Sequence, residues 1–480
     1  MPEAHRSAAA LPRPTPSLTC PGSTVPRWGI AVLVGWLFAT PLWAGPTVVP
    51  TISGQFGQTP APADAVIGTR FESIRGVPND ALLGGLFDVD GVGPEAQFLT
   101  DMINGYPDPV PIDSDALTFT IVAKQPMSSD RIRNAADNGD FVVFSFALDG
   151  TEPETFTVRI ATFDENGTRQ ADIPIANVPT FPLADPSLTK TGVAVDNQGR
   201  VTVAYTELDG GTSRILGRRY NVDGTVVTPE FEINTDGNHL WTDVALLDPA
   251  GNRLIVTTVE QTATIEIKGN IVDFSGGAPV VLPDFLISDT PAAFGNLAPV
   301  VAANQTTGEF TVVWEHTTAV QGDPIDVRAR RFDADGNPIG GDFRVNSTTA
   351  ETQAQPSVAY GANGNSVVAW AADAAVQGDE LDVFFQAYDA QGNPIAGETR
   401  ANATTTEVQD RPQVLFLPEL DNLGQPQFVV TWRDVGVADG TQARGTGQSY
   451  RAFSIGEDPT TIFADGFESG DTSSWSTQQP

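Results

Sequence analysis

Five acidic residues recur at one position of a repeated sequence pattern. They are Asp149, Asp209, Asp323, Asp379 and Asp439, and each lies where a second strand would turn into a third strand. Carboxylate oxygens are the ligands that Ca²⁺ prefers, with about six to eight around one ion. If the repeats are related by rotation, all five lie on one face and could bind Ca²⁺ or a cationic ligand. Asp followed by Gly also forms good turns, so the favoured interpretation is a set of turns whose side chains point apart into water.

Other candidates for chemistry are sparse. The two histidines beyond residue 44, His239 and His316, are more than one repeat apart and are expected to be ordinary surface residues. F-D-V-D-G (Phe87–Gly91) resembles part of a calcium loop but lacks the third acidic ligand, so a plain turn is expected. N-T-D-G-N-H-L-W (Asn234–Trp241) has the wrong order for the Asp-box of propeller sialidases. No spacing singles out a carboxylate pair for glycoside hydrolysis among 60 acidic residues.

A repeat of 56 residues separates Trp314 from Trp370 and Asn346 from Asn402. Such a period indicates stacked supersecondary units. Each unit reads as an alternating strand, an apolar strand, a third strand, a turn that reaches Gly, and a fourth strand, which is typical of a propeller blade. The first two strands recur over Asp130–Ser145, Thr191–Tyr205, Thr242–Thr258, Pro299–Trp314, Pro356–Trp370 and Pro412–Trp432.

The ends of the array predict how it closes. The sixth unit supplies only three strands, the last being Gln448–Phe453, and the missing strand precedes the first unit as Thr118–Ala123. An N-terminal strand that completes the C-terminal blade leaves no open edge there. We therefore expect an all-β fold, a six-bladed β-propeller of four-stranded blades over residues 117–457, closed by an N-terminal strand. Residues 45–116 are expected to be an irregular N-terminal extension.

Aromatic residues share one position at the end of the second strand, namely Tyr205, Trp314, Trp370 and Trp432. They could stack on a ligand, but packing between neighbouring blades is favoured because blade faces need bulky side chains.

Residues 1–44 read as an export signal. Arginines precede the apolar run Trp28–Ala39, and Leu42–Ala44 offers a small residue at the cut. An uncleaved anchor is the alternative. After cleavage no membrane span is expected. The single cysteine, Cys20, lies within this segment, so neither a disulfide nor a thiol nucleophile is expected in the mature chain. A formal net charge of −34 repels phosphate backbones, which argues against nucleic acid as a partner.

Three stretches resemble the tandem repeats of large exported bacterial proteins: F-V-V-T-W (Phe428–Trp432), D-A-D-G-N-P-I-G (Asp333–Gly340) and V-N-S-T-T-A-E-T-Q-A-Q-P-S-V-A (Val345–Ala359). Many of those proteins also carry calcium-binding RTX arrays, but no G-G-x-G-x-D nonapeptide occurs here. I-F-A-D-G-F-E-S-G-D-T-S-S-W-S (Ile462–Ser476) resembles a short tail at the ends of exported proteins of Gram-negative bacteria, which implies export or surface sorting for residues 458–480. A disordered acidic tail is the alternative.

The sequence therefore predicts a secreted or cell-surface protein of a Gram-negative bacterium. We expect a non-catalytic propeller that binds an extracellular protein or glycan without a cofactor. Two alternatives are a propeller hydrolase or lyase that uses rim carboxylates, and a structural module of a surface assembly.

Overall fold

The structure of the chain is a computed structural model. It describes backbone strands between residues 47 and 178, and backbone with most side chains over residues 192–456. The gaps in the second range are 210–211, 222, 235–237, 263, 290–294, 318–323, 350–351, 374–380, 404–407, 421–423 and 439–443. The described residues form strands and no helix, and so include no helix able to span a membrane.

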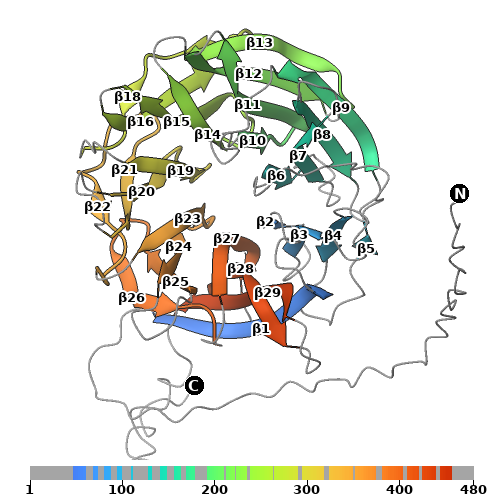
Figure 1. The fold of residues 1–480 in the computed structure, drawn as a ribbon. Coiled ribbons are helices and arrows are strands. Elements are labelled where there is room, and N and C mark those ends of the chain that lie inside the picture. Colours follow the sequence, from blue (N-terminus) through green and yellow to red (C-terminus); the bar gives the residue numbers. More distant parts are fainter. Residues whose placement is uncertain are drawn as a thin grey trace, which may run out of the picture. The chain divides into compact units, whose positions relative to one another are not determined.

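The strands make seven antiparallel sheets, each with four strands along its main path (Figure 1). Sheet 1 contains β2 (Thr69–Ser73), β3 (Ala81–Phe87), β4 (Glu95–Leu99) and β5 (Val110–Pro111). Sheet 2 contains β6 (Ser128–Arg131), β7 (Phe141–Leu148), β8 (Phe156–Phe163) and β9 (Arg169–Val178). Sheet 3 contains β10 (Gly192–Val195), β11 (Arg200–Asp209), β12 (Thr212–Asn221) and β13 (Val226–Asn234). Sheet 4 contains β14 (His239–Leu246), β15 (Arg253–Gln261), β16 (Ile265–Asp273), β17 (Val280–Val281) and β18 (Phe285–Leu286).

The remaining sheets follow in the same order. Sheet 5 contains β19 (Asn296–Ala303), β20 (Phe310–His316), β21 (Asp326–Phe332) and β22 (Phe343–Arg344). Sheet 6 contains β23 (Gln353–Tyr360), β24 (Ser366–Asp373), β25 (Leu381–Tyr388) and β26 (Pro394–Arg400). Sheet 7 contains β27 (Val408–Leu420), β28 (Pro426–Ala438), β29 (Arg444–Gly456) and β1 (Thr47–Pro60).

Seven sheets correct the prediction of six. The additional sheet, β2 to β5, lies in the segment that we expected to be an irregular extension. Its strands lack the tryptophan that recurs in sheets 5 to 7, and its Asp-to-Gly sequence, Asp88–Gly91, follows the second strand instead of the third, so the repeat pattern did not include it.

The strand that completes sheet 7 is also different from the one predicted. β1 pairs with β29 from Thr47↔Gly456 to Pro60↔Gly445, while β28 holds the other edge of β29. Both edges of the strand containing Gln448–Phe453 are therefore occupied without Thr118–Ala123, which lies outside the described residues. An N-terminal strand does complete the C-terminal sheet, but it comes from before sheet 1.

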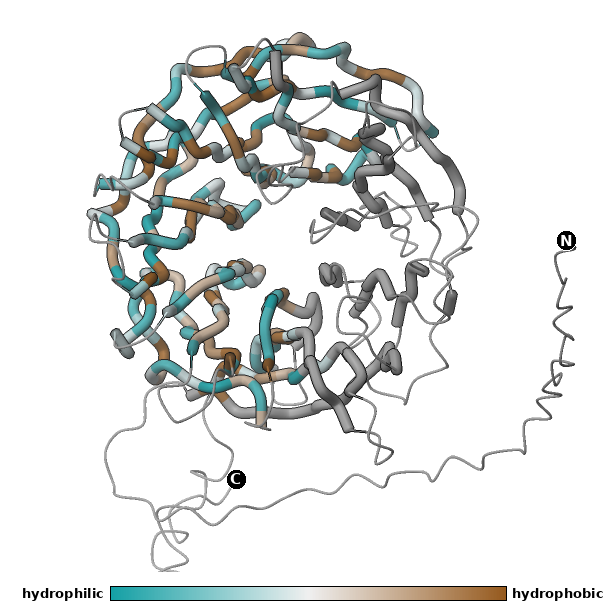
Figure 2. Tube along the Cα trace, in the orientation of Figure 1, coloured by the Kyte–Doolittle hydropathy of each residue, from teal (hydrophilic) through white to brown (hydrophobic). Residues whose placement is uncertain are grey.

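Hydrophobic side chains fill the contacts between successive sheets. Alternate residues of a strand face opposite sides, and Figure 2 shows hydrophobic and hydrophilic positions interleaved along these strands. Trp314 belongs to the cluster between sheets 4 and 5, Trp370 to that between sheets 5 and 6, and Trp432 to that between sheets 6 and 7. Their exposed fractions are 0%, 0% and 5%, which confirms the predicted packing between sheets.

Tyr205 is buried as well, and its hydroxyl donates to Glu230 Oε2 at 2.6 Å. Burial, followed by this hydrogen bond, raises the pKa of Tyr205. The turn chemistry is confirmed in two sheets, where Asp333 and Asp389 each accept two backbone N–H groups and Gly336 and Gly392 have φ angles of 81° and 85°.

Candidate binding rim

The first strands of sheets 4 to 7 share a β-bulge close to their starts. In each sheet two residues of the first strand oppose one residue of the second strand. The pairs and their single partners are Trp241–Thr242 with Thr258, Ala298–Pro299 with Trp314, Gln355–Pro356 with Trp370, and Arg411–Pro412 with Trp432. The repeated tryptophan is therefore the residue that faces the bulge in three of these sheets.

The first residue of each bulge has a left-handed backbone. The φ angles are 48° for Trp241, 51° for Ala298, 58° for Gln355 and 53° for Arg411. A residue with a side chain pays about 1–2 kcal/mol for this conformation, and the bulge type that needs it normally carries glycine. None of the four is glycine. Strain of this kind is concentrated at functional sites, so these positions are candidates for function.

Side chains of one sheet satisfy the bulge N–H groups of the next. The N–H of Gln355 in sheet 6 donates to Glu315 Oε1 of sheet 5 at 2.7 Å. The N–H of Arg411 in sheet 7 donates to Gln355 Oε1 of sheet 6, also at 2.7 Å. The strained backbone is thus held from the preceding sheet, and Gln355 lies directly beside Arg411.

A second pair of bonds has the same direction. The N–H of Val301 in sheet 5 donates to Asp243 Oδ2 of sheet 4 at 3.1 Å. The N–H of Val414 in sheet 7 donates to Ser357 Oγ of sheet 6 at 3.2 Å. These side chains cap backbone donors of first strands, which form the open edges of their sheets and would otherwise lack ladder partners.

Buried polar residues at the start of the first strands fix the tryptophans. Trp314 Nε1–H donates to Asn296 Oδ1 at 3.1 Å, and Trp370 Nε1–H donates to Gln353 Oε1 at 2.8 Å. Asn296 and Gln353 are fully buried. Both indoles are therefore part of the buried core between the sheets. Because they are buried, they cannot stack on a ligand.

The two histidines beyond residue 44 also lie in this buried polar layer, which corrects the expectation that they lie on the surface. His239 and His316 are 1% and 7% exposed. His316 Nδ1 lies 2.8 Å from Asn296 Oδ1. Burial, and next the charge of Arg328, lower the pKa of His316.

The bulge residues differ from this buried polar layer in one respect. In sheets 5 to 7 the bulge is followed by proline and faces tryptophan, whereas the bulge position of sheets 4 to 7 holds Trp241, Ala298, Gln355 and Arg411 in turn. Each of the four is partly exposed. We call these four residues the rim. The rim therefore presents an aromatic ring, a methyl group, an amide and a guanidinium. Such varied side chains suit ligand recognition, and Trp and Arg are typical of binding hot spots.

The five predicted cation ligands do not contribute to a described site. Asp149, Asp323, Asp379 and Asp439 lie outside the described residues, as does the side chain of Asp209, whose backbone pairs with Thr212 at the end of β11. Within the described part of the chain, no three or more His, Cys, Asp or Glu side chains are placed to hold a metal ion.

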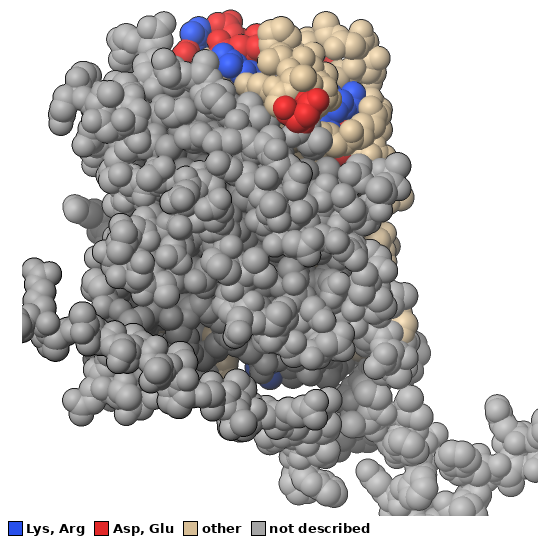
Figure 3. Space-filling view, turned by 90° about the vertical axis from the view of Figure 1, so that its right-hand side faces the viewer, with Lys and Arg blue, Asp and Glu red and all other residues tan. Residues whose placement is uncertain are grey.

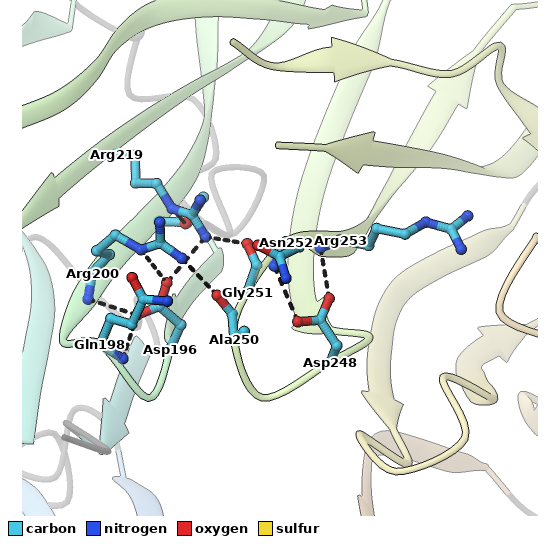
Figure 4. Close-up of polar contacts among 10 residues, drawn as sticks. Asp196, Gln198, Arg200, Arg219, Asp248, Ala250, Gly251, Asn252 and Arg253 are labelled. Atoms are coloured by element: carbon cyan, nitrogen blue, oxygen red, sulfur yellow. Dashed lines mark hydrogen bonds and ion pairs between the residues drawn. The ribbon is translucent and has the colours of Figure 1, made fainter. Parts of the chain in front are cut away.

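The most deeply buried ion pair among the described residues lies within sheet 3, where it contacts sheet 4 (Figure 4). Arg219 and Asp196 are 1% and 0% exposed, and Arg219 Nη2 lies 3.3 Å from Asp196 Oδ2. Arg219 Nε donates to Thr202 Oγ1 at 3.0 Å, and its guanidinium carbon lies 4.1 Å from the centre of the Phe274 ring. Burial, and next the charge of Arg200, lower the pKa of Arg219 to about 10.

The turn of sheet 4 completes this pair. Arg219 also donates to the Gly251 carbonyl, and Arg200 Nη2 donates to the Ala250 carbonyl at 2.6 Å. A Cβ atom on Gly251 would lie 2.7 Å from Arg219 Nη2, so only glycine fits there. These contacts tie sheet 3 to sheet 4, and we interpret the network as structural.

Exposed charges are also paired. Figure 3 shows acidic and basic side chains next to one another on the described part of one face. Ion pairs of this kind in sheet 3 include Arg214 with Glu232 at 2.8 Å and Arg218 with Glu230 at 2.7 Å. Exposed pairs contribute little to stability, about 0–1 kcal/mol each, and they define no site.

Comparison with known proteins identifies no family. No family model and no curated protein matches the chain. Among solved structures, a protein of unknown function from Dyadobacter fermentans has a TM-score of 0.45 and 10% identity, covering 84% of this chain and 98% of its own. An alpha-L-arabinanase from Penicillium chrysogenum complexed with arabinobiose has a TM-score of 0.42 and 13% identity, covering 82% and 98%. A mutant of AofleA from Arthrobotrys oligospora has a TM-score of 0.44 and 10% identity, covering 74% and 90%. At these TM-scores the similarities support no conclusion about activity or ligand.

Proposed function

We propose that the chain is an exported, non-catalytic β-propeller of seven blades that binds a protein or glycan at or outside the cell surface. The contacts between first strands support the closed ring. Each first strand contacts that of the following sheet, and β2 contacts both β6 and β27, so the series returns to its start. The pairing of β1 with β29 supports closure within sheet 7.

The observation that carries the binding function is the set of bulges in four consecutive sheets. A position needed only for packing would repeat its residue type, as Trp314 and Trp370 do. The bulge position instead keeps its strained backbone and changes its side chain from Trp241 to Ala298, Gln355 and Arg411. Different groups displayed on a rigid, repeated backbone suit recognition of a ligand.

Two carboxylates beside the rim support binding over acid–base catalysis. Glu315 and Asp243 each accept a backbone N–H group of the next sheet. Export and cell-surface location rest on the N-terminal segment and the C-terminal resemblance. An acidic face that attracts cations is a further part of the proposal. It rests on the predicted placement of Asp149, Asp209, Asp323, Asp379 and Asp439.

Co-sedimentation of the purified full chain with washed Gram-negative cells tests the function. We expect saturable binding that is lost in Trp241→Ala and kept in Leu286→Ala. Leu286 is a matched control because it is an apolar residue of the same sheet, 40% exposed, but lies on the outermost strand β18. Absence of saturable binding, or release of soluble sugar from the cells by the chain, would contradict the proposal.

A further inference from the structure

We infer that the ligand of the rim is a neutral glycan, with the Trp241 ring as its stacking platform and with Gln355 and Arg411 as hydrogen-bond donors to its hydroxyl groups. This inference rests on the proposed function and names the ligand class of the same site. It follows from the packing of Trp241, the pairing of Gln355 with Arg411, the small residue between them, and the charge of the chain.

Trp241 is held in the way a stacking platform requires. Its ring packs against the buried cluster between sheets 4 and 5 and is still partly exposed. Its backbone is fixed in the left-handed conformation at the start of β14. A rigid aromatic ring gives a large amphipathic contact area and loses little conformational entropy on binding. The apolar C–H face of a sugar ring matches such a surface.

Gln355 and Arg411 are fixed next to each other. The Gln355 side-chain oxygen accepts the Arg411 N–H, and the Gln355 N–H donates to Glu315, so both backbones are anchored. With that oxygen engaged, the remaining polar group of the Gln355 side chain is an N–H donor, and the Arg411 guanidinium has only donors. An amide carries two N–H donors and a guanidinium about five. Donors in such number suit the hydroxyl oxygens of a sugar.

Ala298 separates the two halves of the rim. The contacts run from β14 to β19 and from β19 to β23, so the sheet that carries Ala298 lies between those that carry Trp241 and Gln355. At the bulge position, sheets 4 and 6 carry long side chains, whereas sheet 5 carries only the methyl group of Ala298. A methyl group has less volume than the side chains on either side, which favours a ligand that contacts both.

The charge of the chain argues for a neutral ligand over a polyanion. A net charge of −34 repels sulfated or uronate-rich polymers at long range. Within the rim only Arg411 carries a positive charge, which is too little to reverse that field.

Affinity electrophoresis of the full chain tests the inference. The gels contain soluble arabinan, xylan or galactomannan as neutral probes, or polygalacturonate as the anionic probe. We expect at least one neutral polymer to retard the chain and polygalacturonate to leave its mobility unchanged. Trp241→Ala should weaken the interaction by about thirtyfold or more, the usual effect of removing a central aromatic anchor. Trp241→Phe should retain most of it.

Two further variants separate loss of the site from loss of the fold. Ala298→Gln keeps the tryptophan but fills the gap, and it should weaken retardation with the thermal unfolding midpoint unchanged. Leu286→Ala, on the opposite edge of sheet 4, should leave retardation unchanged. Equal weakening by Leu286→Ala and Trp241→Ala would overturn the placement at the rim.

The outcome also distinguishes this inference from the proposed function. If the chain binds cells but no neutral polymer retards it, the glycan assignment is wrong and a protein ligand is indicated. If only polygalacturonate retards it, the neutral class is wrong. If the chain binds neither cells nor polymers, both proposals fail.

Discussion

Replacing Ala298 by glycine is expected to stabilise the protein, whereas the same change in the same strand at Ala302 is expected to destabilise it. Ala298 has a φ of 51°, while Ala302 is not among the residues with positive φ. Glycine removes the left-handed penalty of about 1–2 kcal/mol and costs about 0.5–1 kcal/mol in lost conformational freedom. The net gain at Ala298 is therefore about 0.5–1 kcal/mol, against a loss of about 0.5–1 kcal/mol at Ala302.

Urea unfolding followed by tryptophan fluorescence measures this difference. The two variants should lie on opposite sides of the wild type, about 1–2 kcal/mol apart in free energy of unfolding. Ala396→Gly provides a control, because Ala396 has a φ of 57° but lies on the outer strand β26. It should also stabilise the protein without affecting ligand binding. Equal destabilisation by Ala298→Gly and Ala302→Gly would refute the argument that the bulges store strain.

Three other outcomes follow from the packing. Trp370→Ala should cost about 3–5 kcal/mol because it empties a fully buried site between sheets 5 and 6; a urea midpoint equal to that of the wild type would contradict this. Cysteines at Val48 and Ile455, which are register partners in β1 and β29, should form a disulfide that mass spectrometry detects after mild oxidation, whereas unpaired thiols in the folded protein would argue against the closing strand. Because His316 has a lowered pKa, the unfolded state binds more protons below its usual value of about 6.5, so stability falls as the pH falls. His316→Gln should reduce the drop in thermal midpoint between about pH 7.5 and 5.5, and an unchanged drop would count against the buried neutral imidazole.

The repeat made the sheet architecture predictable. Trp314 and Trp370, one period apart, predicted equivalent buried positions because only stacked units return the same residue to the same environment. The Asp333 and Asp389 turns were predictable because their hydrogen bonds are local. The sheet β2–β5 was missed because it has no tryptophan at the repeated position and its Asp88–Gly91 sequence follows the second strand instead of the third, and its omission led to the wrong closing strand. Strand pairing between distant segments depends on how many sheets lie between them, which a local pattern does not encode.

The candidate site was hidden for a different reason. A left-handed backbone is usually signalled by glycine, and Trp241, Ala298, Gln355 and Arg411 carry no such signal. Three of them precede proline, at intervals of 57 and 56 residues, and that regularity was the available clue. The burial of His316 depends on Asn296 from a neighbouring strand, so it too required the structure.

Hydroxyl-radical footprinting of the full chain, free and bound to cells, tests the binding rim most directly. It compares oxidation of Trp241 on the rim with that of Val226, which is 60% exposed on the outer strand β13. We predict that binding lowers oxidation of Trp241 several-fold and leaves Val226 unchanged. Protection of Val226 with undiminished oxidation of Trp241 would show that the ligand binds elsewhere and would contradict the account.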